Sequence, residues 1–367
     1  MLPPTSASAA APPLTLDAFL REMPKVELHC HLLGAVRRAT FEDLVRRAGA
    51  PIAMAEIESF YTRGEKPVGV LRVLRALDAM LVKSPDDLHR ITFEYLEDAA
   101  AHGVRYSEFF WNPTGTARDS GIPYAQALGG VVRAIRDAER QHGIVGRLVP
   151  AIDREADPAA ALEMVGWVVE HRADEVVGIG IDYREVDRPP ELFAAAYAAA
   201  RRAGLKTTAH AGEFGLPWTH VQAALDVLQV DRIDHGYTVV DNPAFAARCA
   251  DAGIVFTVVP TNSYYLRTLA PERWALDHPI RRMPGLGLHI HPNTDDPTLH
   301  HVTPTQAWAM MARDFGFDVD QLRAFMLNGL DAAWIDDGTR RRWRDDATRR
   351  FDSLRARLVE PPVGADH

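Results

Sequence analysis

The sequence predicts an α/β protein with a closed (β/α)8 barrel (TIM barrel), and three observations favour that fold. Short apolar runs rich in Val and Ile alternate along the chain with stretches of helical spacing. Each run is apolar almost throughout, which is typical of parallel strands covered by helices. The runs number eight, as in a closed barrel. They are Val26–His31, Val104–Phe110, Val145–Ile152, Val176–Asp182, Lys206–Ala211, Asp231–Gly236, Ile254–Pro260 and Gly287–Asn293.

An open, doubly wound sheet would show the same alternation of strands and helices. Such sheets often carry a Gly-rich phosphate loop after the first strand, and no such loop follows the first run here. The chain has 367 residues, of which 47% are hydrophobic and 25% charged, so its length allows a large core. We therefore expect the barrel.

The first 13 residues differ from the rest of the chain. They contain four prolines and no basic residue, so they lack the charged start and apolar centre of a signal peptide. We expect a disordered lead-in over residues 1–13 and a single domain over residues 14–367. No run reaches the roughly 18 apolar residues of a membrane helix, so we expect a cytoplasmic protein without a membrane partner.

Helices are predicted in three parts of the chain. The long segment between the first two strands should form a helical insertion over one end of the barrel, with helices at Thr40–Ala48, Val70–Leu81 and Pro85–Ala101. Helices between later strands are expected at Tyr124–Gln141, Pro158–His171, Leu192–Ala203 and Pro243–Ala252. Extra C-terminal helices are expected at Pro304–Phe315, Asp318–Leu330 and Thr339–Leu358.

The net charge and the cysteine content disfavour a nucleic-acid partner and a disulfide framework. The formal net charge is −9, from 41 basic and 50 acidic residues, which disfavours a nucleic-acid surface and fits a small-molecule partner. The run Arg340–Arg344 is followed by Asp345 and Asp346, a pattern typical of a solvated helix face. Cys30 and Cys249 are too few for a disulfide framework. The sequence does not indicate the oligomeric state.

Two histidines end the first predicted strand. Alternate side chains of a strand share a face, so His29 and His31 should project together while Cys30 points the other way. Two imidazoles at a barrel mouth can hold one zinc-like ion. For this motif alone, two partly buried histidines bonded to the backbone remain an equal alternative.

Three other predicted strands bring similar residues to their carboxyl ends, where barrel enzymes keep their chemistry. The fifth strand ends in His210-Ala211-Gly212-Glu213, the sixth in Asp234-His235-Gly236, and the eighth leads to Asn293-Thr294-Asp295-Asp296. Together the four strand ends predict one cluster of imidazoles and carboxylates.

Other histidines near the eighth strand are competing candidates. His289 and His291 also alternate, but they precede the strand's end, so we expect them in the barrel or its wall. His300 and His301 could line a pocket, and we expect at least one of them to be exposed. Pro292 removes a ladder donor from this strand and predicts a local bulge.

Taken together, these motifs resemble those of the adenosine and adenine deaminases, a branch of the amidohydrolase superfamily. The resemblance rests on residues 24–31, 210–213, 235–236 and 293–297, in the order of the family. It implies hydrolytic deamination of a 6-aminopurine to the 6-oxopurine and ammonia by a metal-activated water. It also implies one divalent metal ion, most often zinc in such enzymes, with ligands His29, His31, His210 and Asp295.

The resemblance implies further roles at the site. Glu213 would protonate ring N1, which requires a partly neutral carboxyl group, so we expect burial to raise its pKa. His235 would take or steer the proton of the water that attacks C6, and Asp295 would orient that water. Asp296 would bond a ring nitrogen on the far side of the base.

The expected substrate pocket is less well defined. The family carries an Asp or a Glu at the position of Leu33, and a leucine cannot accept a hydrogen bond from a sugar hydroxyl. The fourth strand resembles the adenine branch, whereas Tyr237 resembles the nucleoside branch, so free base, nucleoside and modified purine all remain open. The other candidate pocket residues are Gly180, Asp182, Trp111, Tyr183, Tyr264 and Tyr265.

Two alternatives of a different kind remain open. One is another C–N hydrolase of the superfamily, acting on an N6-substituted adenine or a bulky purine nucleoside. The other is a non-catalytic metal-binding barrel, which would normally have lost at least one of Glu213, His235 and Asp295. A nucleotide substrate is disfavoured, because no cluster of Lys and Arg lies near the motifs.

Overall fold

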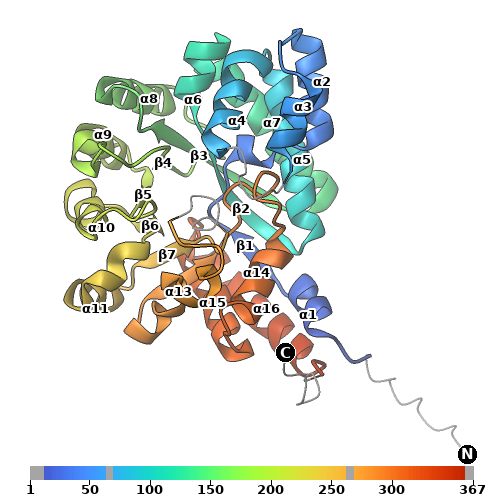
Figure 1. The fold of residues 1–367 in the computed structure, drawn as a ribbon, viewed down its shortest axis with the longest axis vertical. Helices are drawn as coiled ribbons and strands as arrows, with labels where there is room; N and C mark the ends of the chain where they lie inside the picture. Colours follow the sequence, from blue (N-terminus) through green and yellow to red (C-terminus); the bar gives the residue numbers. More distant parts are fainter. Residues whose placement is uncertain (1–11, 63–68, 262–267, 360–367) are drawn as a thin grey trace, which may run out of the picture.

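A computed structural model describes residues 12–62, 69–261 and 268–359, and it confirms the barrel. The described residues form one sheet of eight parallel strands that follow the order of the chain. Figure 1 shows these strands in the middle of the molecule with helices around them. The strands are β1 (Lys25–Glu27), β2 (Val104–Trp111), β3 (Val145–Asp153), β4 (Gly178–Asp182), β5 (Lys206–Ala211), β6 (Arg232–His235), β7 (Val255–Val258) and β8 (His289–Pro292).

The barrel closes between β8 and β1 through residues that follow these two strands. The amide of His31 donates to the carbonyl oxygen of Asp295 at 2.7 Å. The amide of Asp295 donates to the carbonyl oxygen of His29 at 3.0 Å. The side chain of Asn293 adds a third link, because its Oδ1 accepts from the amide of Leu28 at 2.8 Å. The two chain segments that carry the predicted metal ligands are thereby joined directly.

The predicted bulge at Pro292 is wrong. Pairing of β8 with β7 runs without a register shift from His289 to Pro292. The amide of Asn293 continues the ladder by donating to Val258 O at 2.8 Å. In a parallel pair this places the nitrogen of Pro292 on the side away from β7, so the ladder loses no bond there.

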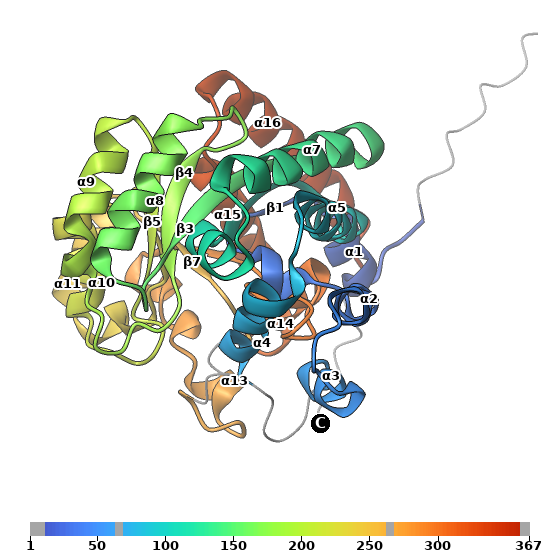
Figure 2. The ribbon, with the colours of Figure 1, turned by 90° about the horizontal axis from the view of Figure 1, so that it is seen from above.

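The helical insertion after β1 is confirmed, and it contains one helix that the periodicity did not reveal. Helices α2, α3 and α4 of this insertion lie at the same end of the molecule as α13 (Figure 2). The unpredicted helix is α3 (Met54–Phe60). The other α-helices of the insertion are α2 (Arg38–Ala48), α4 (Val70–Ala76) and α5 (Pro85–Ala101). Short helices of other types are labelled η, and the insertion contains the 3₁₀ helix η1 (Leu32–Ala35) and the π-helix η2 (Leu77–Leu81).

The remaining helices surround the barrel, and the C-terminal ones match the prediction closely. Before β1 the chain forms α1 (Leu16–Glu22). Between β2 and β8 lie α6 (Pro113–Gly115), η3 (Thr116–Ser120), α7 (Tyr124–His142), α8 (Pro158–Glu170), η4 (Pro190–Phe193), α9 (Ala194–Arg202), α10 (Thr219–Ala223), η5 (Ala224–Leu228), η6 (Tyr237–Asp241), α11 (Pro243–Asp251), α13 (Trp274–Asp277), η7 (Pro279–Arg281) and η8 (Pro284–Leu286). The C-terminal helices are α14 (Pro304–Arg313), α15 (Val319–Ala332) and α16 (Asp337–Arg355).

Both ends of the described chain lie together. The amide of Leu14 donates to Arg357 O at 2.7 Å, and the amide of Val359 donates to Leu14 O at 3.0 Å. The expected disordered lead-in falls mostly on residues 1–11, which lie outside the described residues. The expected single domain over residues 14–367 includes further segments outside them and stays a prediction.

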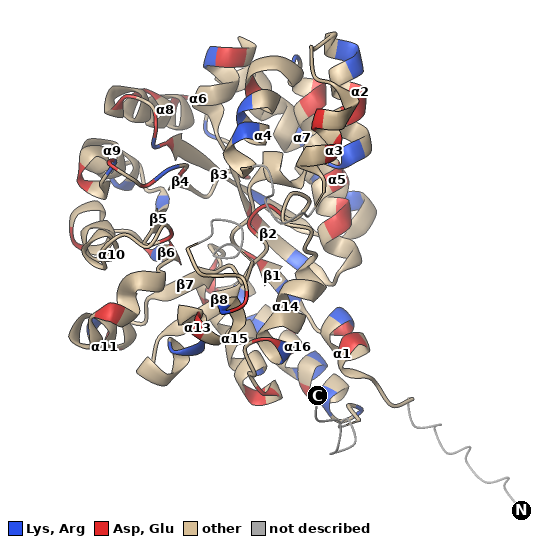
Figure 3. Cartoon of the chain, viewed as in Figure 1, with Lys and Arg blue, Asp and Glu red and all other residues tan. Residues whose placement is uncertain are grey.

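Acidic and basic residues are interspersed along the outer helices (Figure 3). In α16 the predicted mixed face is present, since Arg349 pairs with Asp346 and Arg344 pairs with Asp331 of α15. None of the helices in the described part of the chain is long and apolar enough to cross a membrane.

Asp78 of η2 is a buried carboxyl group that fastens the insertion to the loop after β2. The hydroxyl of Thr116 donates to its Oδ1 at 3.1 Å, and the hydroxyl of Ser120 donates to its backbone carbonyl. Its Oδ2 is buried and has no hydrogen-bond partner among the described residues. Burial raises the pKa of Asp78 to about 7, against the effect of the Thr116 hydrogen bond.

We expect Asp78 to make stability depend on pH between about 4 and 7. Its folded-state pKa of about 7 lies above the ordinary 3.8, so the stability that its neutral form contributes is complete in acid and lost as the pH rises to 7. Asp78→Asn stays neutral, so its Tm relative to wild type should rise by a few degrees over this range and then level off. Thermal unfolding across the range measures this difference. The exposed Asp345→Asn should follow wild type, and a constant offset of Asp78→Asn would contradict the prediction.

Candidate active site

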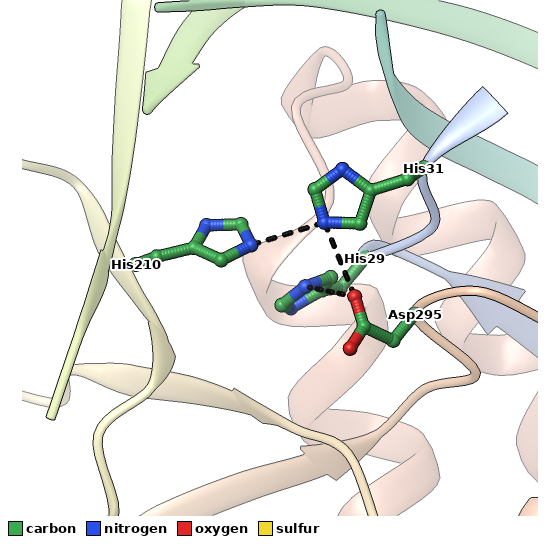
Figure 4. Close-up of side chains that lie close together, drawn as sticks. All are labelled: His29, His31, His210 and Asp295. Carbon is green, nitrogen blue, oxygen red and sulfur yellow. Dashed lines mark hydrogen bonds and ion pairs between the residues drawn. The ribbon is translucent and has the colours of Figure 1, made fainter. Parts of the chain in front are cut away.

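Three imidazoles and one carboxylate converge at the carboxyl ends of the strands. The groups come from His29 and His31 after β1, His210 of β5 and Asp295 after β8, and their ligand atoms all lie within 4.8 Å of one another. Figure 4 shows these side chains pointing toward a common centre. Asp295 Oδ1 lies 3.2 Å from His29 Nε2 and 3.1 Å from His31 Nε2. The structure thus brings together the whole set of expected metal ligands.

Each of the three imidazoles has a polar side chain close to its Nδ1 atom, on the side away from the cluster. His29 Nδ1 lies 3.1 Å from Thr257 Oγ1, and His31 Nδ1 lies 3.5 Å from Asp182 Oδ2. His210 Nδ1 lies 3.3 Å from Asp234 Oδ2. A partner at Nδ1 fixes the tautomer and turns Nε2 toward the centre, as around metal-binding histidines in general.

The close approach of these imidazole nitrogens and the carboxylate oxygen indicates a cation between them. The Nε2 atoms of His31 and His210 lie 3.1 Å apart, so their two lone pairs need a proton or a metal ion between them. His29 Nε2 is buried and makes no hydrogen bond to the described residues. Burial lowers the pKa of His210, which favours the neutral imidazole that binds metals. Although burial alone would raise it, the neighbouring imidazoles of His29 and His31 hold the pKa of Asp295 well below its usual value.

His235 and Glu213 lie beside this cluster. His235 Nε2 is 3.7 Å from Glu213 Oε2, and both residues form a second close group with Asp295. His235 is fully buried and Glu213 is 8% exposed. Burial holds the pKa of His235 well below its usual value, so its imidazole is neutral.

The neighbouring Tyr237 determines which nitrogen of His235 carries the proton. The Tyr237 hydroxyl donates to Val259 O at 2.9 Å, and it lies 3.2 Å from His235 Nδ1. Since the hydroxyl hydrogen is already used, the hydroxyl oxygen accepts from Nδ1–H. His235 Nε2 therefore carries a lone pair, and it has no hydrogen-bond partner among the described residues.

Three of the six described non-glycine residues with positive φ lie at or next to this site. His235, Asp295 and Tyr183 have φ angles of 63°, 66° and 66°, in the left-handed region that side chains other than glycine rarely adopt. Each such residue costs of order 1–3 kcal/mol and is kept where the surroundings over-determine it. The strain is consistent with a site shaped for chemistry.

Asp296 lies at the edge of the cluster. Its Oδ2 is 3.9 Å from His300 Nε2, and its Oδ1 is buried without a hydrogen-bond partner among the described residues. Burial and the neighbouring Asp295 raise the pKa of Asp296 well above its usual value. His300 is 2% exposed and His301 is partly exposed, so the expected exposure of one of this pair is met only in part.

Two of the expected pocket residues, Gly180 and Trp111, make clear packing contacts. Gly180 of β4 faces the barrel interior, where a Cβ atom would lie only 2.8 Å from the ring of Phe110. That ring lies 5.2–5.4 Å from the rings of His29, His31 and His210, so it forms the floor of the cluster. Gly180 therefore makes room for Phe110, and its expected contact with substrate stays a prediction.

Trp111 is the second of these residues, and its pocket role also stays a prediction. Its ring stacks on Tyr124 of α7 at 5.7 Å, and its Nε1 donates to Thr116 Oγ1 at 3.0 Å. It is 2% exposed. It follows Phe110 on β2, and because successive side chains of a strand point to opposite faces, its ring lies against the outer helices.

The other pocket candidates have mixed outcomes. Asp182 Oδ2 lies 3.5 Å from His31 Nδ1 and can support that imidazole, and its expected substrate contact stays a prediction. The ring of Tyr183 lies under the guanidinium of Arg75 at 3.9 Å, and Leu33 of η1 is 5% exposed. The pocket roles of Tyr183 and Leu33 stay predictions. Tyr264 and Tyr265 lie outside the described residues.

The second pair of alternate histidines does not join the cluster. His291 is buried between Phe325 O and Val26 O, at 3.0 and 3.1 Å from its two ring nitrogens. His289 is exposed. The expectation that this pair belongs to the barrel or its wall agrees with the position of His291.

The sequence interpretation missed several supporting residues. Asp234 precedes His235 in β6. Its Oδ1 accepts a hydrogen bond from Thr257 Oγ1 at 2.7 Å, and its Oδ2 lies 3.3 Å from His210 Nδ1. Its presence in the motif was noted, but nothing local shows that it reaches β5 and β7. Glu185, in the loop after β4, is a further missed residue and is described below.

Comparisons with known proteins agree with this geometry. A family model described as adenosine deaminase matches residues 24–349. An adenine deaminase of Ralstonia nicotianae is 32% identical over 321 residues, covering 86% of this chain and 91% of that protein. An adenine deaminase of Rhodospirillum rubrum is 31% identical, covering 86% of this chain and 93% of that protein.

Two solved structures resemble the chain over nearly its whole length. A zinc-bound amidohydrolase from Burkholderia ambifaria has 63% identity and a TM-score of 0.91, covering 96% of this chain and 95% of that one. The adenine deaminase of Arthrobacter aurescens has 29% identity and a TM-score of 0.81, covering 89% of this chain and 98% of that one. The chain therefore belongs to the adenosine deaminase family.

Proposed function

We propose that the protein is a metal-dependent hydrolase that deaminates an adenine-type purine to the 6-oxopurine and ammonia. The observation that carries this proposal is the convergence of His29, His31, His210 and Asp295 within 4.8 Å, with Glu213 and His235 beside them. The relatives named as adenine deaminases support the reaction class.

The cluster fits one divalent metal ion, for which we propose zinc. Three imidazole nitrogens and a carboxylate oxygen are ligands that zinc prefers, and the bound zinc of the Burkholderia amidohydrolase supports this choice. When bound, such an ion lowers the pKa of a water molecule in contact with it from 15.7 to about 7.

The residues of this chain then divide the proton transfers. His235 Nε2, which carries a lone pair, accepts a proton from the water whose oxygen attacks C6 of the purine. Glu213 delivers a proton to ring N1, which makes C6 electrophilic. As the C6–N bond breaks, the amino group takes the proton held by His235 and leaves as ammonia. The remaining proton of the C6 hydroxyl passes to Glu213, so both residues return to their starting forms and the purine gains a 6-oxo group.

Asp296 would orient the base. Burial and the neighbouring Asp295 raise the pKa of Asp296, which favours the neutral carboxyl group that could donate to an unprotonated ring nitrogen. Its Oδ1 has no competing partner among the described residues. Leu33 offers no acceptor for a sugar hydroxyl, which supports a free adenine-type base over a nucleoside.

The test is release of ammonia from adenine and adenosine, and of the substituted amine from N6-substituted adenines, by zinc-loaded protein. We expect turnover with at least one of these, and higher kcat/KM for free bases than for nucleosides. Preference for a nucleoside would overturn the substrate choice alone. No release of ammonia or amine from any 6-aminopurine would overturn the proposed function.

A Tyr237 variant tests the role of His235 as base. Tyr237→Phe removes the acceptor for His235 Nδ1–H, so the proton can move to Nε2 and block the base. We expect kcat to fall about 10-fold or more while KM and metal content change little. Tyr197→Phe is the matched control, because that buried hydroxyl donates to Thr208 O at 2.7 Å and its ring lies in α9. Equal kinetics of the two variants would contradict the role.

A further inference from the structure

The segment that carries both His210 and Glu213 is held by a carboxylate from a different loop. Glu185 has a fully buried side chain in the loop between β4 and η4. Its Oε1 accepts from the amide of Gly212 at 2.9 Å, and its Oε2 accepts from the amide of Glu213 at 3.2 Å. Its Oε1 also lies 2.9 Å from His220 Nδ1. Two consecutive amides of the segment are thus bound to one carboxylate.

The carboxylate is kept ionised by its surroundings. Burial alone would raise the pKa of Glu185, but the hydrogen bond to His220 and the nearby guanidinium of Arg154 hold it below its usual value. Arg154 is itself fully buried, and its Nη2 donates to His210 O at 2.7 Å. The segment is therefore held by a cation at its first residue and by an anion at its third and fourth.

The turn between these residues has little freedom to move. Gly212 has a φ of +69°, and a Cβ atom there would lie 2.5 Å from Thr238 Oγ1. The backbone therefore passes close to η6 on one side and is bound to Glu185 on the other. The side chain of Glu213 starts from this fixed point, with its Oε2 3.7 Å from His235 Nε2.

We infer that Glu185 is a positioning residue for Glu213, which it serves by fixing the backbone from which that acid reaches the purine ring. The inference rests on the proposed function, because it takes Glu213 as the proton donor to N1. Misplacing a reacting group by about 1 Å can cost roughly 100-fold in rate.

Glu185→Gln is the sharpest test, because it keeps the shape of the side chain. The amide oxygen of the new side chain can occupy the Oε1 position, where two donors converge. Its NH2 group then faces the amide of Glu213, and two donors at about 3.2 Å cannot bond. The imidazole of His210 keeps its partner Asp234, so the variant should retain one zinc per chain.

Glu175→Gln is the matched control. Glu175 is also a buried carboxylate, and it pairs with Arg136 at 2.6 Å. It precedes β4, whereas Glu185 follows that strand, so the two lie toward opposite ends of the barrel. We expect Glu175→Gln to keep wild-type activity.

Two readouts separate positioning from folding. For zinc-loaded Glu185→Gln we expect kcat with the best purine of the panel to fall about 10- to 100-fold, with a smaller change in KM. Hydrogen exchange of the peptide spanning residues 210–214 should become faster than in wild type and in Glu175→Gln. Should Glu185→Gln not fold, His220→Ala, which removes one contact of the carboxylate, should change both readouts in the same direction by less.

The outcomes decide the inference in each case. Unchanged exchange, or faster exchange with unchanged kcat, would overturn it. Loss of zinc from Glu185→Gln would also overturn it, by showing that the residue supports the metal ligand rather than the acid. If wild-type protein deaminates no purine, the proposed function fails, and the exchange measurement alone then decides whether Glu185 fixes the segment.

Discussion

Glu213→Gln should retain one metal ion per chain and lose most of its turnover. The amide has the shape of the carboxyl group but cannot deliver a proton to ring N1, and general acid catalysis of this kind contributes about 100- to 10,000-fold. Glu213 is not among the four converging ligand groups, so metal binding should be unaffected. The measurement pairs kcat for the best purine substrate with metal analysis of the same sample.

The matched comparison for that variant is Glu175→Gln, which makes the same chemical change in a buried carboxyl group before β4. It should retain both metal and turnover. Near-normal turnover of Glu213→Gln at full metal content would remove Glu213 from the mechanism and leave the geometry of the cluster standing.

Asp295→Ala should lose both metal and activity. The carboxylate is the one anionic ligand of the cluster, and its Oδ1 lies within 3.2 Å of two imidazole nitrogens. Removing it leaves three neutral groups around a divalent ion, and the backbone bonds between Asp295 and β1 keep the fold closed without the side chain. Metal analysis after dialysis measures the loss.

The exposed Asp345→Ala is the control for Asp295→Ala and should bind metal as wild type does. Stoichiometric metal in Asp295→Ala would place a ligand elsewhere. His291 could not take over, because both of its ring nitrogens face backbone carbonyls of β1 and α15.

The positions of the strands and the ends that carry chemistry could be predicted from the sequence. Buried parallel strands are apolar along their length, and their carboxyl ends meet at one face whatever the details of packing. His29, His31, His210 and Asp295 could therefore be placed together before any contact was known. The alternation of side chains along the residues that follow β1 also separates Cys30 from the cluster formed by His29 and His31.

Contacts between different strands could not be predicted in the same way. Alternation shows that Phe110 and Trp111 face opposite sides of β2, but not which one faces inward. The choice depends on Gly180, whose missing side chain leaves space for the Phe110 ring across the barrel. The contact between Asp182 and His31 likewise could not be predicted, because it joins residues 151 positions apart in the chain.

Short elements of the insertion were also beyond the sequence pattern. The seven residues of α3 make about two helical turns, too few for a clear period. Glu185 carries no local signal, because its function depends on two backbone amides of the next strand's loop. Residues whose partners are backbone groups are invisible to motif analysis.

The most direct test of the account is anomalous diffraction at the zinc edge from a crystal of the zinc-loaded protein. We predict one peak at the cluster, about 2.0–2.2 Å from a nitrogen of His29, His31 and His210 and from an oxygen of Asp295. A protein that deaminates purines at full rate with its metal bound elsewhere, or with none, would contradict the account.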